Sequence, residues 1–439
     1  MAERRITHGP YGHMLTNAAV WSADGRWIVY DTRSAPDGSV FDGTRIERVD
    51  VDSGRVELLY ESRSGACCGV VTASPVDDRV VFILGPERPD ERWRYGAARR
   101  QGVVVRASRP GVAEALDARD LVPPFTPGAL RGGSHVHLFS GDGRLVSFTY
   151  EDAFFERLGD TAGPADARDP APGHEKNLRA VGVTLCGRAV AVPATHPRNH
   201  GGSGVTVLVT RLEDAARPGG DSITRAFEEA WVGDAGYRRP DGSLQRYALA
   251  FQGNVTTPAG STIAEVFVVD LPDDPAALTE PGEAPLAGTE TTRPAPPRGV
   301  RQRRLTRTAD RRYPGIQGPR HWLRSSPDGS RIACLMRDER GVVQIFSVSP
   351  SGGEPTQMPH DPWPVASSFT WSPDGTRIAY VADGSVMTVT VADGTSRRHT
   401  AATVGDGAPR PEACVFSPDG ARIAFMRCVP HNQVFVVDV

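Results

Sequence analysis

The stretch WSPDGTRIAY (371–380) is one of five closely similar segments in this chain. The others are FSPDGARIAF (416–425), SSPDGSRIAC (325–334), WSADGRWIVY (21–30) and FSGDGRLVSF (139–148). In each segment, Asp or Ser can cap backbone N–H groups and Gly can adopt a positive φ, which together make a tight turn. Alternating apolar residues follow the turn, as in a β-strand. Each segment therefore predicts a β-hairpin.

The spacing of these hairpins indicates a repeat. The last three copies lie about 45 residues apart, which is the length of a four-stranded propeller blade. ASPVDDRVVF (73–82) is a more divergent sixth copy, and a third strand is expected after each hairpin. The chain is therefore predicted to be an all-β, seven-bladed β-propeller of four-stranded blades, with residues 1–439 forming one domain.

Blade four has no S-P-D-G turn and is predicted from its strands. GGSGVTVLV (201–209) resembles GGSHVHLFS (132–140), so it is expected to be the first strand of this blade. YALAFQG (247–253) and EVFVVDL (265–271) are expected to be its second and third strands.

Blade four is also expected to hold an insertion of one helix and loops at about residues 210–300. DSITRAFEEAW (221–231) is the predicted helix, since Asp221 or Ser222 could cap it.

The two ends of the chain are expected to share one blade. The C-terminal VFVVDV (434–439) is a third strand, so the last blade lacks its outer strand. RRITH (4–8) matches QRRLT (302–306), which is expected to close blade four. RRITH can therefore supply the missing strand, and closing the ring removes an exposed sheet edge.

Composition limits the possible partners. The net charge is −3 with no dominant basic block, which argues against nucleic acid as a partner. No run of about 18 apolar residues predicts a membrane span. No secretory signal is seen and the six cysteines fit a reducing compartment, so a cytoplasmic location is expected. None of the cysteines forms a C-x-x-C pair, which argues against a thiolate zinc site. The sequence leaves the oligomeric state open.

Four longer blocks resemble the YidR-like family of enterobacterial proteins. They are LTNAAVWSADGRWIVYDTR (15–33), GGSHVHLFSGDGRLVSFTYED (132–152), GTETTRPAPPRGVRQRRLT (288–306) and PRHWLRSSPDGSRIACLMRDE (319–339). The resemblance implies a TolB-like propeller, distantly similar to oligogalacturonate lyases. Those lyases are seven-bladed, bind Mn²⁺ through histidines and a glutamine, and eliminate across a uronate ring. The family's own function is unknown, so the resemblance supports the fold more than the activity.

One column of residues is expected at the mouth of the central channel, five positions before each turn serine. It contains Asn17, Gly69, His135, His321, Ser367 and Glu412, with Gly204 filling the place in blade four. Alternate residues of a strand share one side, so His135 and His137 are expected to project together.

This pair suggests a metal site. His135, His137 and His321 are the candidate ligands, with Glu412 or Asn17 as a fourth. Imidazole and carboxylate ligands suit Mn²⁺, Fe²⁺ or Zn²⁺. The lyase resemblance favours Mn²⁺ and matches the His-x-His pair, but Gly132 stands where the lyases have their glutamine. The alternative is that these histidines are only hydrogen-bonded in a polar channel mouth.

Two arginines and two further histidines complete the candidate site. Arg131 and Arg320 flank the histidine blocks and could bind an anionic substrate together with Asn17, although surface salt bridges explain each arginine equally well. His196 and His200 are candidate general bases.

Two functions follow from these residues. The first is a metal-dependent lyase in which the metal and arginine hold the carboxylate of a carboxylated sugar, or of a similar small anion, while a histidine removes the adjacent proton. Hydrolysis or epimerisation would use nearly the same groups. The second is a non-catalytic, TolB-like propeller that serves as a scaffold for a small ligand or a protein.

Overall fold

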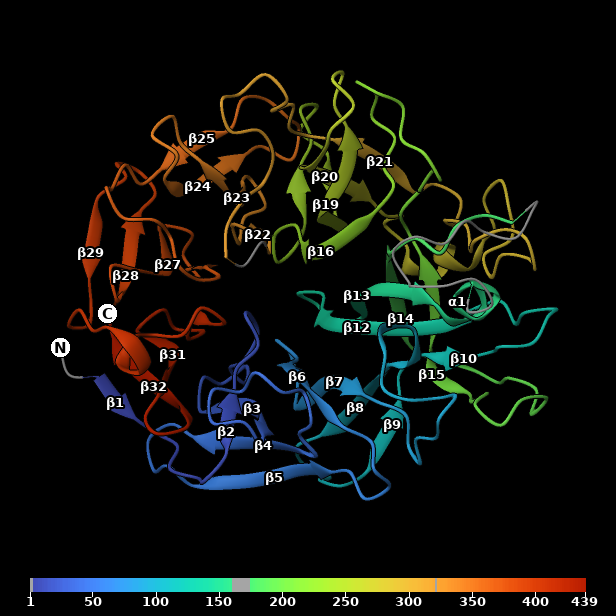
Figure 1. The fold of residues 1–439 in the computed structure, drawn as a ribbon, viewed down its shortest axis with the longest axis horizontal. Helices are drawn as coiled ribbons and strands as arrows, with labels where there is room; N and C mark the ends of the chain where they lie inside the picture. The colour runs from blue at the N-terminus through green and yellow to red at the C-terminus, as the bar shows by residue number, and fades with distance from the viewer. Residues whose placement is uncertain (1–2, 160–173, 320–321) are drawn as a thin grey trace.

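Seven four-stranded antiparallel sheets stand around a common centre in the computed structural model (Figure 1), which describes residues 3–159, 174–319 and 322–439. This arrangement confirms the predicted seven-bladed, nearly all-β propeller. The sheets are called blades one to seven, in the order of their innermost strands along the chain. Among the described residues, no helix is long and apolar enough to cross a membrane.

The strands of each blade are given from the innermost outward. Blades one to three consist of β2 (Gly12–Met14), β3 (Trp27–Arg33), β4 (Arg45–Asp50) and β5 (Val56–Glu61); β6 (Cys68–Ala73), β7 (Arg79–Leu84), β8 (Gln101–Arg106) and β9 (Ala113–Ala115); and β12 (Gly132–Phe139), β13 (Leu145–Asp152), β14 (Ala180–Val190) and β15 (Gly202–Leu208). Blades four to seven consist of β16 (Ala226–Trp231), β19 (Ala248–Thr256), β20 (Thr262–Asp270) and β21 (Arg301–Arg304); β22 (Arg324–Ser325), β23 (Ile332–Arg337), β24 (Val343–Val348) and β25 (Thr356–Met358); β26 (Thr370–Trp371), β27 (Arg377–Ala382), β28 (Ser385–Thr390) and β29 (Ser396–Arg398); and β30 (Cys414–Phe416), β31 (Arg422–Cys428), β32 (Asn432–Asp438) and β1 (Glu3–Arg5).

The remaining elements connect or decorate the blades. They are the pairs β10 (Ala118–Arg119) with β11 (Ala129–Leu130) and β17 (Tyr237–Arg238) with β18 (Leu244–Gln245), the helix α1 (Ala153–Gly159), and the short 3₁₀ turns η1 (Ala97–Arg99), η2 (Pro275–Thr279) and η3 (Gly405–Gly407).

The repeated turn forms as the sequence predicts. In blade six, the Ser372 hydroxyl donates to the Asp374 carboxylate at 2.5 Å and accepts from the backbone N–H of Arg377 at 2.9 Å. Gly375 has a φ of 70°, a conformation that glycine adopts without strain. The turn therefore joins the two inner strands of the blade at a fixed length.

Two predictions for blade four are wrong. GGSGVTVLV contains β15, the outermost strand of blade three, where Gly204 pairs with Cys186. The predicted helix instead contains β16, which pairs antiparallel with β19. Blade three has a long excursion between its second and third strands, which begins with α1. Because of this excursion, the sequence assigns β15 to blade four as its first strand, although β15 is the fourth strand of blade three. The true first strand of blade four, β16, is then predicted to be a helix.

Apolar side chains between neighbouring sheets form the core. Val20 of blade one, for example, packs in one buried cluster with Val415 and Val434 of blade seven. Burying such residues on both faces of each sheet stabilises the ring as a whole.

The N-terminal strand closes the ring, as predicted. Glu3, Arg4 and Arg5 of β1 pair with β32, and the Ile6 N–H donates to the Val434 carbonyl at 2.9 Å. Ile6 is buried, and Glu3 forms an ion pair of 2.7 Å with Arg427. Blade seven is therefore built from both ends of the chain.

Removing residues 1–6 should lower the free energy of unfolding by about 3 kcal/mol or more, because it exposes the edge of β32 and the Ile6 pocket. Urea denaturation followed by circular dichroism measures this change. A chain that starts at Glu3 is the matched control and should unfold like the full chain. Equal stability of all three chains would contradict closure by β1.

Candidate active site at the propeller axis

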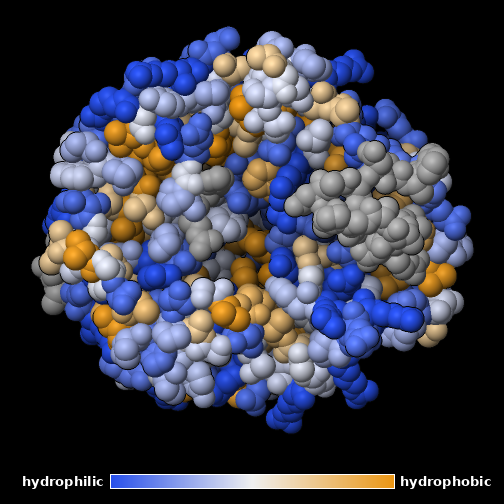
Figure 2. Space-filling model, in the orientation of Figure 1, coloured by the Kyte–Doolittle hydropathy of each residue, from blue (hydrophilic) through white to orange (hydrophobic). Residues whose placement is uncertain are grey.

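Two oppositely charged side chains from neighbouring blades lie buried near the axis. Glu229 lies on β16 of blade four, and Arg324 lies on β22 of blade five. Their relative exposures are 0 % and 7 %. One face of the ring, seen in Figure 2, is hollowed near its centre. They form no ion pair with each other in the described part of the chain. Each charge therefore remains available to a third group.

The Glu229 carboxyl is held as a weak acid. Burial raises its pKa from 4.5 to about 7, against the opposing effect of a hydrogen bond from Thr149. The Thr149 hydroxyl donates to Oε2 at 2.7 Å, while Oε1 has no hydrogen-bond partner. A carboxyl with this pKa and a free oxygen can accept a proton at neutral pH.

Arg324 extends across the channel. Its Nη2 donates at 2.5 Å to the Asn17 side-chain oxygen of blade one, which is not adjacent to blade five, and its Nη1 donates to the Leu323 carbonyl at 2.7 Å. Its Nε is buried without a partner. Burial lowers the pKa of Arg324 to about 10, so the guanidinium is still charged at neutral pH. The site thus contains a fixed cation with unused donor capacity.

A bulge in the innermost strands decides which side chains face inward. Its central residue has a positive φ in three blades: Val70 (57°), Val136 (58°) and Glu228 (55°). The pairing register shifts at the same places, between Gly69 and Thr72, His135 and Leu138, and Phe227 and Ala230. A bulge adds one residue and so reverses the alternation of faces. Glu229 therefore occupies in blade four the place that His137 occupies in blade three.

The same bulge separates His135 from His137. His137 Nε2 lies 3.0 Å from the Ser134 hydroxyl, and a Cβ on Gly102 of blade two would approach it to 2.7 Å. His135 pairs across the sheet with Thr149, on the face that points to Glu229. The two imidazoles therefore lie on opposite faces of β12, and burial lowers the pKa of His137 to about 3. The prediction that they project together is wrong.

Three arginine side chains act on the buried imidazole of His135. Burial, and then the charges of Arg100, Arg179 and Arg225, hold the pKa of His135 well below its usual value. These arginines immediately precede β8, β14 and β16, so three strand starts in blades two to four place positive charge together. His135 is therefore a neutral imidazole, and its Nδ1 is buried without a partner.

Among the described residues, the other predicted metal ligands form no cluster with His135. Glu412 lies 3.6 Å from Arg410, at the start of blade seven, and has a further interaction. His321, like the predicted substrate-binding Arg320, lies outside the described residues. Among the described residues, no group of three His, Cys, Asp or Glu side chains could hold a metal ion. The described residues therefore do not form the predicted metal site by themselves.

Arg131 has a structural role. Its Nε donates to Asp152 at 2.6 Å, and both side chains are buried. Its guanidinium also packs against the rings of Phe125, Phe154 and Phe155. This position does not fit the predicted role in binding a substrate, because the charge is already paired within the core.

His196 and His200 lie in the connection to β15, the outermost strand of blade three, and not before an innermost strand as predicted. His200 Nδ1 lies 3.1 Å from the Gly201 carbonyl, and burial lowers the pKa of His200 to about 4. His196 Nδ1 accepts from the Arg198 backbone at 3.1 Å. Both histidines thus belong to the outer part of blade three, and the axial site has a different candidate base.

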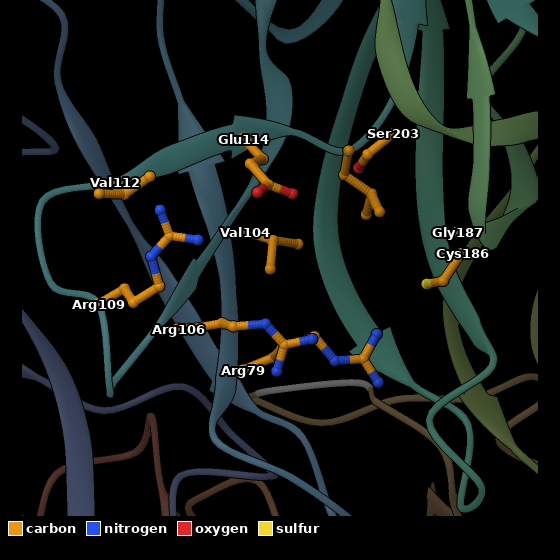
Figure 3. Close-up of a pocket in the computed structure, with 10 residues that line it drawn as sticks. Arg79, Val104, Arg106, Arg109, Val112, Glu114, Cys186, Gly187 and Ser203 are labelled. Atoms are coloured by element: carbon orange, nitrogen blue, oxygen red, sulfur yellow. The ribbon is translucent and has the colours of Figure 1, made fainter.

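A polar pocket between blades two and three, about 160 Å³ in volume, is separate from the axial site (Figure 3). Four charged side chains face it: Arg79 from β7, Arg106 from β8, Arg109 from the loop that precedes β9, and Glu114 from β9. Arg79 and Arg106 already hold Asp77 and Asp78 at 2.7 and 3.0 Å. The pocket therefore offers less free charge than its lining suggests.

The raised pKa of Glu229 predicts a specific dependence of stability on pH. The folded protein binds this proton more tightly than the unfolded chain does, so the contribution of Glu229 is present below pH 4.5 and is lost as the pH rises through 7. Glu229→Gln should therefore gain stability relative to wild type between pH 5 and pH 8, by on the order of 3 kcal/mol.

Urea denaturation at both pH values measures this difference, with exposed Glu114→Gln as the control that should show none. A difference between Glu229→Gln and wild type that is the same at both pH values would contradict the raised pKa.

Comparisons with known proteins agree with this architecture. The model of a family described as proteins of unknown function (DUF3748) matches residues 67–200. Oligogalacturonate lyase in complex with manganese has a TM-score of 0.54 at 15% identity, covering 99% of this chain and 92% of that one. Oligogalacturonate lyase from Vibrio parahaemolyticus also has a TM-score of 0.54, at 9% identity, with 99% and 93% covered. At these identities the likeness shows the fold alone.

A full-length relative is much more similar in sequence. The uncharacterized protein YidR of Escherichia coli (strain K12) is 44% identical over 426 residues, which are 97% of this chain and 95% of the relative. The resemblance found in the four sequence blocks is thereby confirmed. The chain belongs to the YidR family of β-propeller proteins.

Proposed function

We propose that this protein is a lyase that binds a small carboxylated molecule, such as a uronate sugar, at the propeller axis and eliminates across it. The observation that carries the proposal is the buried Glu229 carboxyl, whose pKa is about 7, in the electrostatic field of Arg324. A base and a fixed cation at one site are the two groups that elimination next to a carboxylate requires.

Each residue has a defined part in this reaction. The Arg324 guanidinium holds the substrate carboxylate and disperses the negative charge that develops when the neighbouring C–H bond breaks. Glu229 Oε1 takes that proton, and Thr149 fixes the other oxygen. The C–H electron pair forms the new carbon–carbon double bond, and the β-carbon–oxygen bond breaks. The leaving oxygen takes a proton from water, and Glu229 later returns its proton to solvent.

The channel mouth supports an anionic substrate. Arg100, Arg179 and Arg225 all act on the pKa of His135, so their charges reach the same small region. Arg179 also holds the Glu151 carboxylate, and the positive charge that remains raises the local concentration of anions and speeds their encounter with the site. The neutral imidazole of His135 can accept a hydrogen bond from a sugar hydroxyl there.

The sequence also predicts a divalent metal, Mn²⁺ first, and one of the similar solved structures is a manganese complex. Of the described ligands, His135 alone lies on the Glu229 side of β12, and its Nδ1 is buried without a hydrogen-bond partner. A metal-dependent form of the reaction would need further ligands, such as His321, beside it. The proposed mechanism therefore uses only Glu229, Thr149 and Arg324.

The elimination is tested with digalacturonate, whose unsaturated product absorbs ultraviolet light. Activity should rise with pH through about 7, as Glu229 loses its proton. Glu229→Gln should lower the rate by about 100-fold or more while remaining folded, and Glu114→Gln should match wild type. If wild type binds the uronate tightly but neither it nor any variant turns it over, the result would instead support the second function, a non-catalytic scaffold.

The role of a metal is tested by elemental analysis of tag-free protein together with EDTA treatment. We expect turnover to persist in EDTA, because the proposed base and cation are both side chains. A stoichiometric metal that disappears in His135→Ala, with loss of turnover in EDTA, would support the metal-dependent form and contradict a mechanism that uses side chains alone.

A further inference from the structure

The contact between Arg324 and Asn17 is unusual among the contacts of the ring, because it joins two blades that are not neighbours. Asn17 lies in the irregular stretch between β2 and the Trp21–Ile28 bridge of blade one, and both side chains are buried. Packing between neighbouring sheets does not require this bond. The bond holds the Arg324 guanidinium in place through an uncharged acceptor, the Asn17 amide oxygen.

We infer that the Asn17 carboxamide occupies, in the ligand-free protein, the position on Arg324 that the carboxylate of the ligand takes when it binds. The inference rests on the proposed function. A carboxamide and a carboxylate are planar groups of nearly the same size, and Asn17 uses one oxygen at 2.5 Å. A carboxylate offers two charged oxygens to the same guanidinium, and such a bidentate ion pair is stronger and more directional than the single bond that the neutral amide oxygen accepts.

The unused donor of Arg324 supports this exchange. Nε is buried with no partner while Asn17 is bound, so the guanidinium holds one more N–H than the protein satisfies. A bidentate carboxylate would satisfy both Nε and Nη2, which point to the same edge of the group. Leaving such a donor unpaired costs stability, and the ligand recovers that cost.

Asn17 then becomes a determinant of specificity. A neutral ligand, such as an ester or an unmodified sugar, would have to displace the amide without gaining charge, and so gains little on Arg324. A carboxylated ligand gains the ion pair. The same residue therefore keeps Arg324 extended in the absence of ligand and excludes uncharged analogues.

Isothermal titration calorimetry of wild type, Asn17→Asp, Asn17→Ala and Arg324→Gln tests the exchange, with D-galacturonate as the probe and its methyl ester as the neutral control. Wild type should bind the acid at least about tenfold more tightly than the ester. Asn17→Asp should weaken binding of the acid at least about tenfold, because the new carboxylate occupies Arg324 permanently. Asn17→Ala should bind the acid about as well as wild type.

The outcomes separate this inference from the proposed function. If Arg324→Gln abolishes binding but Asn17→Asp binds the acid as wild type does, the exchange is wrong and the axial site stands. If Arg324→Gln binds the acid as well as wild type, the proposed site itself is wrong. If wild type binds no uronate, melting temperatures decide whether a carboxylate replaces the amide on Arg324: Asn17→Asp should melt above wild type, and equal or lower values would overturn the exchange.

Discussion

The innermost strands of seven sheets converge on one axis, and side chains there lose most of their contact with water. Loss of water disfavours any isolated charge, which is why the Glu229 carboxyl has a pKa of about 7 and the Arg324 pKa falls to about 10. A structural ion pair would have relieved both costs, yet the two groups do not pair. The ring keeps them apart, with Thr149 holding one and Asn17 the other.

The architecture could be predicted because its signals are local. Each S-P-D-G turn involves only a few consecutive residues, and the match between RRITH and QRRLT was enough to identify β1 as the closing strand. Blade four lacks that turn, and the capping residues of DSITRAFEEAW (221–231) predict a helix where the structure has β16. The sequence nevertheless contains a signal for this strand. FEEAW (227–231) corresponds in length and place in the blade to HVHLF (135–139), with glutamates at its second and third positions.

The candidate site was harder to predict because it depends on the bulge. Strict alternation puts His135 and His137 on one face, whereas the extra residue at Val136 turns His137 toward Gly102 of blade two. The same device turns Glu229 toward Thr149. Arg131 shows the converse difficulty, since nothing local to the sequence reveals that Asp152 and three phenylalanine rings enclose it. Asn17 was identified as a candidate contact to substrate, but its partner lies 307 residues away.

The chemistry proposed for the axis depends on the protonation of one carboxyl. Infrared difference spectroscopy of wild type against Glu229→Gln isolates the carboxyl band of Glu229 as the pH is changed, independently of any substrate. This band should convert from the protonated to the ionised form near pH 7. Conversion near pH 4.5, the ordinary value for a glutamate, would mean that the axis is well solvated and that Glu229 is not a poised base.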